Sequence, residues 1–278
     1  MNELISTLPN HLFSVQRRGR VHERPLNIEI EAGGIKHNST VLRAYLPTLV
    51  VGIMITDSTP IGRLEAFRKS FSYPTPGIIL KHFFVKGVVD WETRPFSNSS
   101  DVIRVDMMEN MNAGKTFHWI RMAAMWLKEN AHGHILDGIV KMDIDTAVNW
   151  TKFATDVFPT LPLSYYTGRR NGHEICGGAP YCPPTGCADF TDECWIYMSG
   201  GWYAMSMDVA WKLTMECLYA SSNMDGFEDL QVGVWIRQCG LKHVNIKSVD
   251  NGFFFCHHSG MDDATVASGN YGSLTCKK

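Results

Sequence analysis

The stretch ILDGIVKMDID, residues Ile135–Asp145, decides how the fold is interpreted. Its first part, Ile135–Met142, is short and mostly apolar, which predicts a buried strand. The strand leads into Asp143-Ile144-Asp145, the only D-x-D in the chain. In an open parallel sheet, ligands bind beyond the carboxyl ends of the strands. The two acids therefore stand where a ligand site is expected.

Around this stretch the chain alternates short apolar runs with segments of helical periodicity. Besides residues 135–142, strands are predicted over 46–56, 78–87, 102–105 and 244–255, and residues 195–205 are predicted to be ordered. Helices are predicted over 61–71, 115–130, 150–157, 208–220 and 227–239, the first capped by Asp57-Ser58-Thr59-Pro60. This alternation is typical of an α/β domain, which we expect over 46–278 with a loop insertion at 159–194. Residues 1–45 are polar and rich in turn formers, and we interpret them as a stem or an edge segment.

The composition excludes several classes of protein. The chain has 26 basic and 28 acidic residues and a net charge of −2, so no overall field selects nucleic acid or an anionic membrane. No apolar run reaches the roughly 18 residues that a membrane span needs, and no signal-peptide pattern opens the chain. We expect a globular protein that binds its ligands locally.

The eight cysteines are unevenly placed, and four of them cluster within 176–194. An even number among Gly and Pro residues suggests disulfides formed in an oxidising compartment. Reduced buried thiols, or a zinc site that includes His173, are the alternatives. Asn-x-Ser/Thr sequons at Asn38, Asn98 and Asn149 fit a glycoprotein of the secretory pathway.

Two acidic pairs and a histidine pair are the candidate chemical groups. Alternation along a strand puts Asp143 and Asp145 on one face, where two carboxylates suit Mn²⁺ or Mg²⁺ shared with a diphosphate. The alternative is a polar strand end with Asp145 as a helix cap. Glu228-Asp229 opens the helix at 227–239, where the helix dipole favours acids with or without a function. His257 and His258 are either structural or metal ligands.

Six blocks, taken in order, resemble motifs of the β-1,3-glycosyltransferases, which comprise galactosyl- and N-acetylglucosaminyltransferases and fringe-like enzymes. The family motifs are RR-x-x-IR-x-TW, FxxG, D-x-x-D-x-Y-x-NLT-x-KT, K-x-DDD, Y-x-SGxGYVLS and PEDVYVG. The blocks similar to them are, respectively, Gly62–Phe71, Phe83–Gly87, Asp101–Thr116, Lys141–Asp145, Trp195–Ser206 and Phe227–Gly233. The chain departs from the family at Ile144, which replaces the middle acid of the triplet, and it shows no N-terminal membrane anchor.

The resemblance implies a GT-A fold, meaning a Rossmann-like open mixed sheet flanked by helices. It implies an inverting hexosyltransferase of the Golgi lumen that forms a β-1,3 linkage. The donor would be UDP-galactose or UDP-N-acetylglucosamine, and the acceptor a glycan hydroxyl. Mn²⁺ would be held by Asp145, Asp143 and one of His257 and His258, and Asp229 would be the catalytic base.

The resemblance also suggests donor-binding residues, namely Arg63, Arg68, Lys115, Asp143, Gly200 and Gly201. A salt-bridged role is an equal alternative for each basic residue, and an ordinary turn for each glycine. Because Ile144 removes one acid, a catalytically inactive relative that binds a glycan or a protein is the alternative function. A retaining transferase with the same fold is a third hypothesis.

Overall fold

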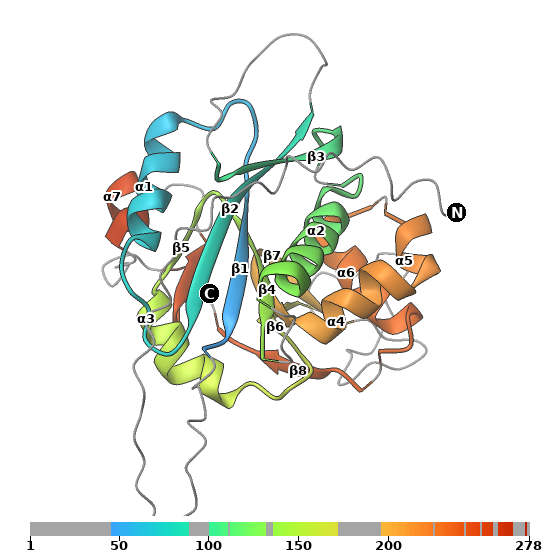
Figure 1. Ribbon diagram of the computed structural model, residues 1–278. Helices are drawn as coiled ribbons and strands as arrows, with labels where there is room; N and C mark the ends of the chain where they lie inside the picture. The colour runs from blue at the N-terminus through green and yellow to red at the C-terminus, as the bar shows by residue number, and fades with distance from the viewer. Residues whose placement is uncertain are drawn as a thin grey trace, which may run out of the picture. The chain divides into compact units, whose positions relative to one another are not determined.

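A seven-stranded mixed sheet runs through the computed structural model in the order β3-β2-β1-β4-β7-β6-β8 (Figure 1). Its strands are β1 (Thr48–Met54), β2 (Ile79–Val88), β3 (Val102–Met108), β4 (Gly138–Asp143), β6 (Tyr165–Asn171), β7 (Tyr197–Ser206) and β8 (Asn245–Ser248). The structure describes residues 46–88, 100–110, 112–131, 136–171, 196–224, 226–241, 243–250, 252–257, 261–268 and 276. Strand β1 pairs in parallel with β2 and β4, whereas β7 runs antiparallel to β4 and β6.

Helices cover both faces of this sheet. They are α1 (Ile61–Phe71), α2 (Lys115–Asn130), α3 (Trp150–Lys152), α4 (Met207–Trp211), α5 (Leu218–Ser222), α6 (Glu228–Gln238) and α7 (Asp263–Ser268). In Figure 1, α1, α3 and α7 lie on one side of the strands and α2, α4 and α6 on the other. The predicted α/β class, an open mixed sheet flanked by helices, is confirmed.

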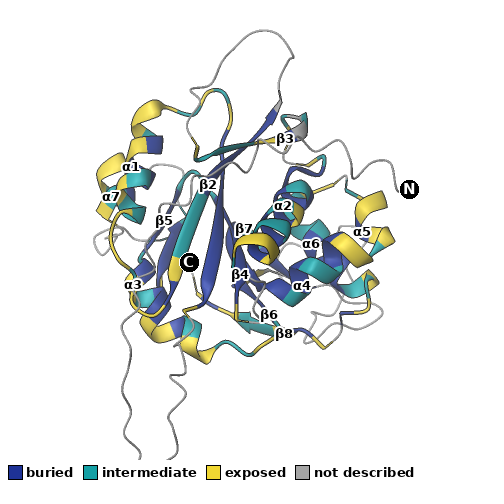
Figure 2. Cartoon of the chain, viewed as in Figure 1, coloured by how far each residue is buried: buried dark blue, intermediate teal, exposed yellow. Residues whose placement is uncertain are grey.

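Side-chain alternation along β1 divides the apolar interior into two cores. Leu49, Val51 and Ile53 enter one core, and Val50 and Met54 enter the other. Every residue of β1 is buried (Figure 2), as expected for a central parallel strand with helices on both faces.

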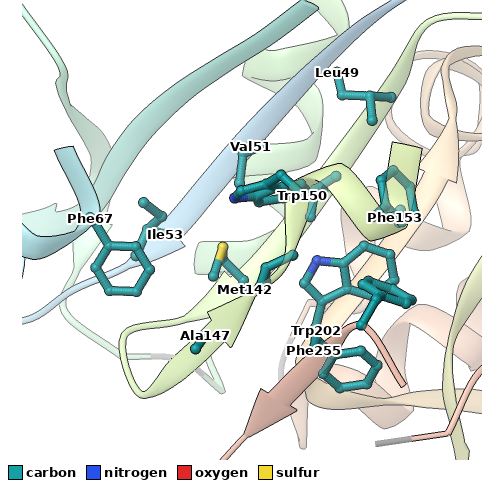
Figure 3. Packing of buried hydrophobic residues seen from close by; sticks show 14 of the residues in the cluster. Leu49, Val51, Ile53, Phe67, Met142, Ala147, Trp150, Phe153, Trp202 and Phe255 are labelled. Carbon is teal, nitrogen blue, oxygen red and sulfur yellow. The ribbon is translucent and has the colours of Figure 1, made fainter. Parts of the chain in front are cut away.

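Aromatic side chains fill much of the first core (Figure 3). The ring of Phe153 lies 6.1 Å from that of Trp150 and 5.4 Å from that of Trp202. Trp202 in turn stacks on Phe255 at 5.4 Å. This packing ties the sheet to a second, two-stranded one.

The second sheet pairs β5 (Thr146–Val148) with β9 (Phe255–His257) in antiparallel fashion. The register sets Thr146 opposite His257 and Val148 opposite Phe255. It brings a segment near the end of the chain beside the turn that follows β4.

Some helix boundaries agree with the sequence predictions, whereas one loop prediction and one strand prediction need correction. The helices predicted over 61–71 and 115–130 are observed with the same bounds. The predicted loop at 159–194 is wrong in part, because Tyr165–Asn171 forms β6 between β7 and β8. The single strand predicted over 244–255 is wrong, because β8 and β9 belong to different sheets.

Three helix predictions also need correction. The segment 208–220 divides into α4, a π-helical turn at Lys212–Glu216, and α5. The segment 150–157 begins as α3 and continues as a π-helical turn at Phe153–Val157. The predicted cap of α1 is wrong, because Pro60 occupies the N-cap and no side chain caps the helix. Helix α7 was not expected.

Two disulfides join described cysteines, Cys217 to Cys239 and Cys256 to Cys276. They confirm the expectation of disulfides and exclude reduced thiols at these four positions. The cysteine cluster at 176–194 and the proposed stem at 1–45 lie outside the described residues. No helix in the described ranges is both long and apolar enough to cross a membrane.

Candidate metal and nucleotide site

The candidate site lies at the point where the order of the strands reverses. From β1 the sheet continues to β2 and β3 on one side, and β4 then lies on the other side of β1. Ligands of open α/β sheets bind at the carboxyl ends of the strands at such a switch point. The last residue of β4, Asp143, pairs with Met54 at the end of β1. Asp143 therefore stands at the switch point.

A tight turn, rather than strand alternation, brings the two acids together. Strand β4 ends at Asp143, Ile144 and Asp145 form the turn, and β5 begins at Thr146. The side chain of Ile144 packs against the first core. The predicted convergence of the acids is thus observed, but the predicted reason for it is wrong. The alternative role of Asp145 as a helix cap is also wrong, because Asn149 caps α3 by accepting from the Lys152 amide at 2.9 Å.

His257 completes a group of three ligands. Its Nε2 atom lies 3.0 Å from Oδ1 of Asp145 and 3.8 Å from Oδ2 of Asp143. One ligand atom from each residue lies within 4.8 Å of the other two. Two carboxylates and an imidazole form a donor set suited to Mn²⁺ or a similar divalent ion. The residues present therefore fit the predicted metal, while His258 lies outside the described residues.

The hydrogen bond between His257 and Asp145 shifts the pKa of both groups. It raises the pKa of the His257 imidazole, although burial acts in the opposite direction. Burial acts to raise the pKa of Asp145, but the interactions with His257 outweigh it and the pKa is lowered. Asp145 is therefore held as a carboxylate, the form that binds a cation.

Gly201 makes room for the His257 ring. A Cβ atom at Gly201 would lie 2.4 Å from Cγ of His257, a distance that real side chains do not tolerate. The carbonyl of Gly201 accepts a hydrogen bond from Oγ1 of Thr146 at 2.8 Å, which joins β7 to the start of β5. The glycine expected to approach the sugar thus makes room for the ring of a candidate metal ligand, while its contact with the sugar stays a prediction.

A buried lysine connects the acidic turn with α6. The Nζ atom of Lys141 donates to Oδ1 of Asp143 at 2.8 Å, to Oε2 of Glu228 at 2.9 Å, and to the carbonyl of Gly200. Burial acts to lower the pKa of Lys141, but the two carboxylates more than offset it and raise the pKa. The hydroxyl of Tyr203 donates to Oε1 of Glu228 at 2.7 Å, so both oxygens of this buried acid are bonded.

Asp229, the predicted base, is next to this network and partly accessible. Its Oδ2 accepts from the amide of Gly200 at 3.2 Å, and its Oδ1 accepts from the amide of Leu230 at 2.9 Å. These bonds fix the carboxylate at the first turn of α6, close to β7. Its role as a base stays a prediction.

The three basic residues suggested for donor binding all have partners within the protein. Arg63 contacts Asp263 at 2.6 Å, and Arg68 contacts Asp101 at 2.7 Å. Lys115 is fully buried and donates to Glu109 and to the Ile55 carbonyl, both at 2.6 Å. These contacts support the salt-bridged alternative, while donor binding by these residues stays a prediction.

Sequence reasoning missed the roles of Lys141, Thr146 and Tyr203. Lys141 stood in one of the motif blocks, and a lysine inside an apolar strand was the available signal for a buried ion pair. Nothing local marks Thr146 or Tyr203, because their partners come from distant parts of the chain.

A surface cavity of about 430 Å³ lies elsewhere, along α3 and the end of α1. Tyr73, Trp150 and Lys152 contribute to its lining, and the described acids of the candidate site do not. The cavity is separate from the metal ligands.

Comparison with known proteins adds little to this geometry. No family model matches the sequence, and no curated protein matches it. One similar solved structure is a glycosyltransferase involved in the glycosylation of the major capsid of PBCV-1, with 13% identity and a TM-score of 0.38. The similarity covers 80% of this chain and 97% of that one. Because this superposition is weak, the function rests on the geometry of the site.

Proposed function

We propose that the protein is a metal-dependent glycosyltransferase of the GT-A type. The observation that carries this proposal is the grouping of Asp143, Asp145 and His257 within 4.8 Å beside the end of β4. A divalent cation at a sheet switch point is a natural binding site for the diphosphate of a nucleotide sugar. The sequence resemblance supports the finer proposal of an inverting transferase that uses UDP-galactose or UDP-N-acetylglucosamine.

The cation would be held by the three ligands and would be Mn²⁺. When bound, such an ion neutralises charge on a departing diphosphate, so the leaving group needs no protonation. Four carboxylates lie at or beside the site, those of Asp143, Asp145, Glu228 and Asp229, and Lys141 is bonded to two of them. Lys141 orients Asp143 through one oxygen.

Asp229 is proposed to accept the proton of the acceptor hydroxyl. Its position in the first turn of α6 favours the ionised carboxylate, because the helix dipole stabilises negative charge there. The acceptor oxygen would attack the anomeric carbon as its proton moves to Asp229 and the bond to the nucleotide breaks. A single displacement of this kind inverts the anomeric centre. The acceptor would be a glycan, and a β-1,3 linkage is the product that the resemblance favours.

The compartment proposed is the Golgi lumen. Two disulfides among the described cysteines support an oxidising environment.

The alternative is an inactive relative that binds a glycan or a protein. It is favoured by one observation, that Ile144 packs against the core and brings only backbone to the site. An inactive relative would bind UDP without turning over any UDP-sugar.

A donor panel tests the proposal. The purified chain is incubated with UDP-sugars and Mn²⁺, and release of UDP is measured. UDP should be released from UDP-galactose or UDP-N-acetylglucosamine, and the release should stop when Mn²⁺ is chelated or Asp145 is changed to Asn. Asp229→Asn should abolish transfer but retain UDP binding. Binding of UDP with no turnover of any donor would favour the inactive relative.

A further inference from the structure

The guanidinium of Arg63 bridges three parts of the chain around the metal ligands. Arg63 lies in the first turn of α1, and its side chain is only 17% exposed. Nη1 donates to the carbonyl of Ile144 at 3.3 Å, Nη2 donates to the carbonyl of Met261, and Nε donates to Oδ1 of Asp263 at 2.6 Å. One side chain thus joins α1, the acidic turn and the segment that begins α7.

The two backbone acceptors of Arg63 lie close in sequence to the candidate metal ligands. Ile144 lies between Asp143 and Asp145 in the acidic turn. Met261 is buried and lies in the same C-terminal region as His257. The ligand set comes from two segments far apart in the sequence; Arg63 is bonded to the acidic turn at Ile144 and to Met261, four residues after His257.

The shape of the guanidinium suits this bridge. Its N–H groups form a rigid planar fork that can donate hydrogen bonds to several acceptors at once. A lysine ammonium on a flexible stem cannot reproduce this geometry. The Asp263 partner is half exposed, so the ion pair by itself contributes little stability. The two backbone carbonyls are therefore the acceptors through which Arg63 can hold the segments in place.

We infer that Arg63 is a positioning residue for the metal ligands, and that it holds the acidic turn and the C-terminal segment together. The inference rests on the proposed function for the identity of the bound cation. In this role Arg63 would act on the metal ligands through the carbonyls of Ile144 and Met261.

The charge of Arg63 and its positioning role predict opposite changes in metal affinity when Arg63 is removed. The guanidinium of Arg63 is bonded to the carbonyl of Ile144, next to Asp145 in the chain, so its positive charge repels a cation bound there. If Arg63 acted only through its charge, Arg63→Ala would strengthen metal binding. If it positions the ligands, Arg63→Ala would weaken metal binding, and the sign separates the two roles.

The experiment measures Mn²⁺ affinity without nucleotide, by electron paramagnetic resonance, for wild type, Arg63→Ala and Arg63→Lys. Lys69→Ala is the matched control, because it removes one positive charge from an exposed position of the same helix. We expect Arg63→Ala to lose about 10-fold or more in affinity, the usual effect of residues that orient metal ligands. Arg63→Lys should keep the charge but lose most of the affinity, and Lys69→Ala should bind as wild type does.

Crystal structures of the metal-free wild type and Arg63→Ala provide a second readout. We expect the contact of His257 with Asp145, 3.0 Å in the wild type, to be broken in the variant. An affinity that rises or stays unchanged in Arg63→Ala, with this contact intact, would overturn the inference. A wild type that binds no Mn²⁺ would count against the proposed function, while the contact would still decide the role of Arg63.

Discussion

The imidazole of His257 lies 3.0 Å from the carboxylate of Asp145, and the pairing of β5 with β9 sets the two segments that carry these side chains next to each other. His257 is opposite Thr146 in this pairing, directly beside Asp145. The proposed site of chemistry therefore depends on a small second sheet as much as on the large one.

The two adjacent glycines of β7 should respond differently to a methyl group. A Cβ at Gly201 would meet the His257 ring at 2.4 Å, so Gly201→Ala must displace a metal ligand. A Cβ at Gly200 would lie 3.4 Å from its nearest neighbours, an ordinary contact. We expect Gly201→Ala to lower Mn²⁺ affinity about 10-fold or more, and Gly200→Ala to retain it. Titration calorimetry checks this, and equal affinities for the two variants would count against a role for His257.

The buried lysine should be required for stability. Lys141→Met would leave Glu228, which is 9% exposed, without its cation, and loss of one partner from a buried ion pair costs about 3–5 kcal/mol. Asp143 is 28% exposed and should add less to this cost. Glu228→Gln should cost less, because its amide oxygen can still accept a hydrogen bond and Lys141 keeps Asp143. Urea unfolding provides the measurement. A Lys141→Met protein as stable as the wild type would show that the network does not hold the acidic turn.

The two disulfides should contribute similarly to stability but differently to metal binding. They close loops of nearly equal length, with sequence separations of 22 for Cys217–Cys239 and 20 for Cys256–Cys276. Removing either should lower the free energy of unfolding by about 2–4 kcal/mol. Only Cys276→Ser should also weaken Mn²⁺ binding, because Cys256 precedes the ligand His257. If Cys239→Ser weakened Mn²⁺ binding equally, the effect would be one of general stability.

Acid should destabilise the fold through His82. Burial lowers the pKa of His82 to about 4, and its ring stacks on Phe71 with centroids 4.4 Å apart. In the unfolded chain the pKa is about 6.5, so the unfolded state binds the proton first as the pH falls. Stability should therefore decrease between about pH 6.5 and pH 4, by on the order of 3 kcal/mol in full.

His82→Phe keeps an aromatic ring against Phe71 and removes the titrating group. Its free energy of unfolding, measured by urea at a series of pH values, should fall less steeply over this interval than that of the wild type. Parallel curves for the two proteins would assign the acid sensitivity to other groups.

Local sequence patterns predicted the regular parts of the fold. The helices α1 and α2 have apolar stripes that end at clear boundaries, and their observed bounds match the predictions. Strand β6, with the sequence YYTGRRN, has no alternating pattern and forms because β7 and β8 lie beside it. Its pairing is a tertiary effect that propensity does not show.

The sequence predicted which residues form the candidate site better than it predicted the contacts that position them. Asp143, Asp145 and His257 were named from their residue types and from a resemblance, and the structure brings them together. The link from Lys141 to Glu228 and the bridge made by Arg63 join residues distant in sequence. Such contacts depend on the final packing, so no local pattern reveals them.

The most direct test of the central claim is the binding of UDP with and without Mn²⁺, measured by titration calorimetry on the wild type and on Asp145→Asn. A cation held by Asp143, Asp145 and His257 should make UDP binding to the wild type depend on Mn²⁺, and Asp145→Asn should lose that dependence together with most of the affinity. UDP binding that is the same with Mn²⁺ and with a chelator, or unchanged in Asp145→Asn, would contradict the account.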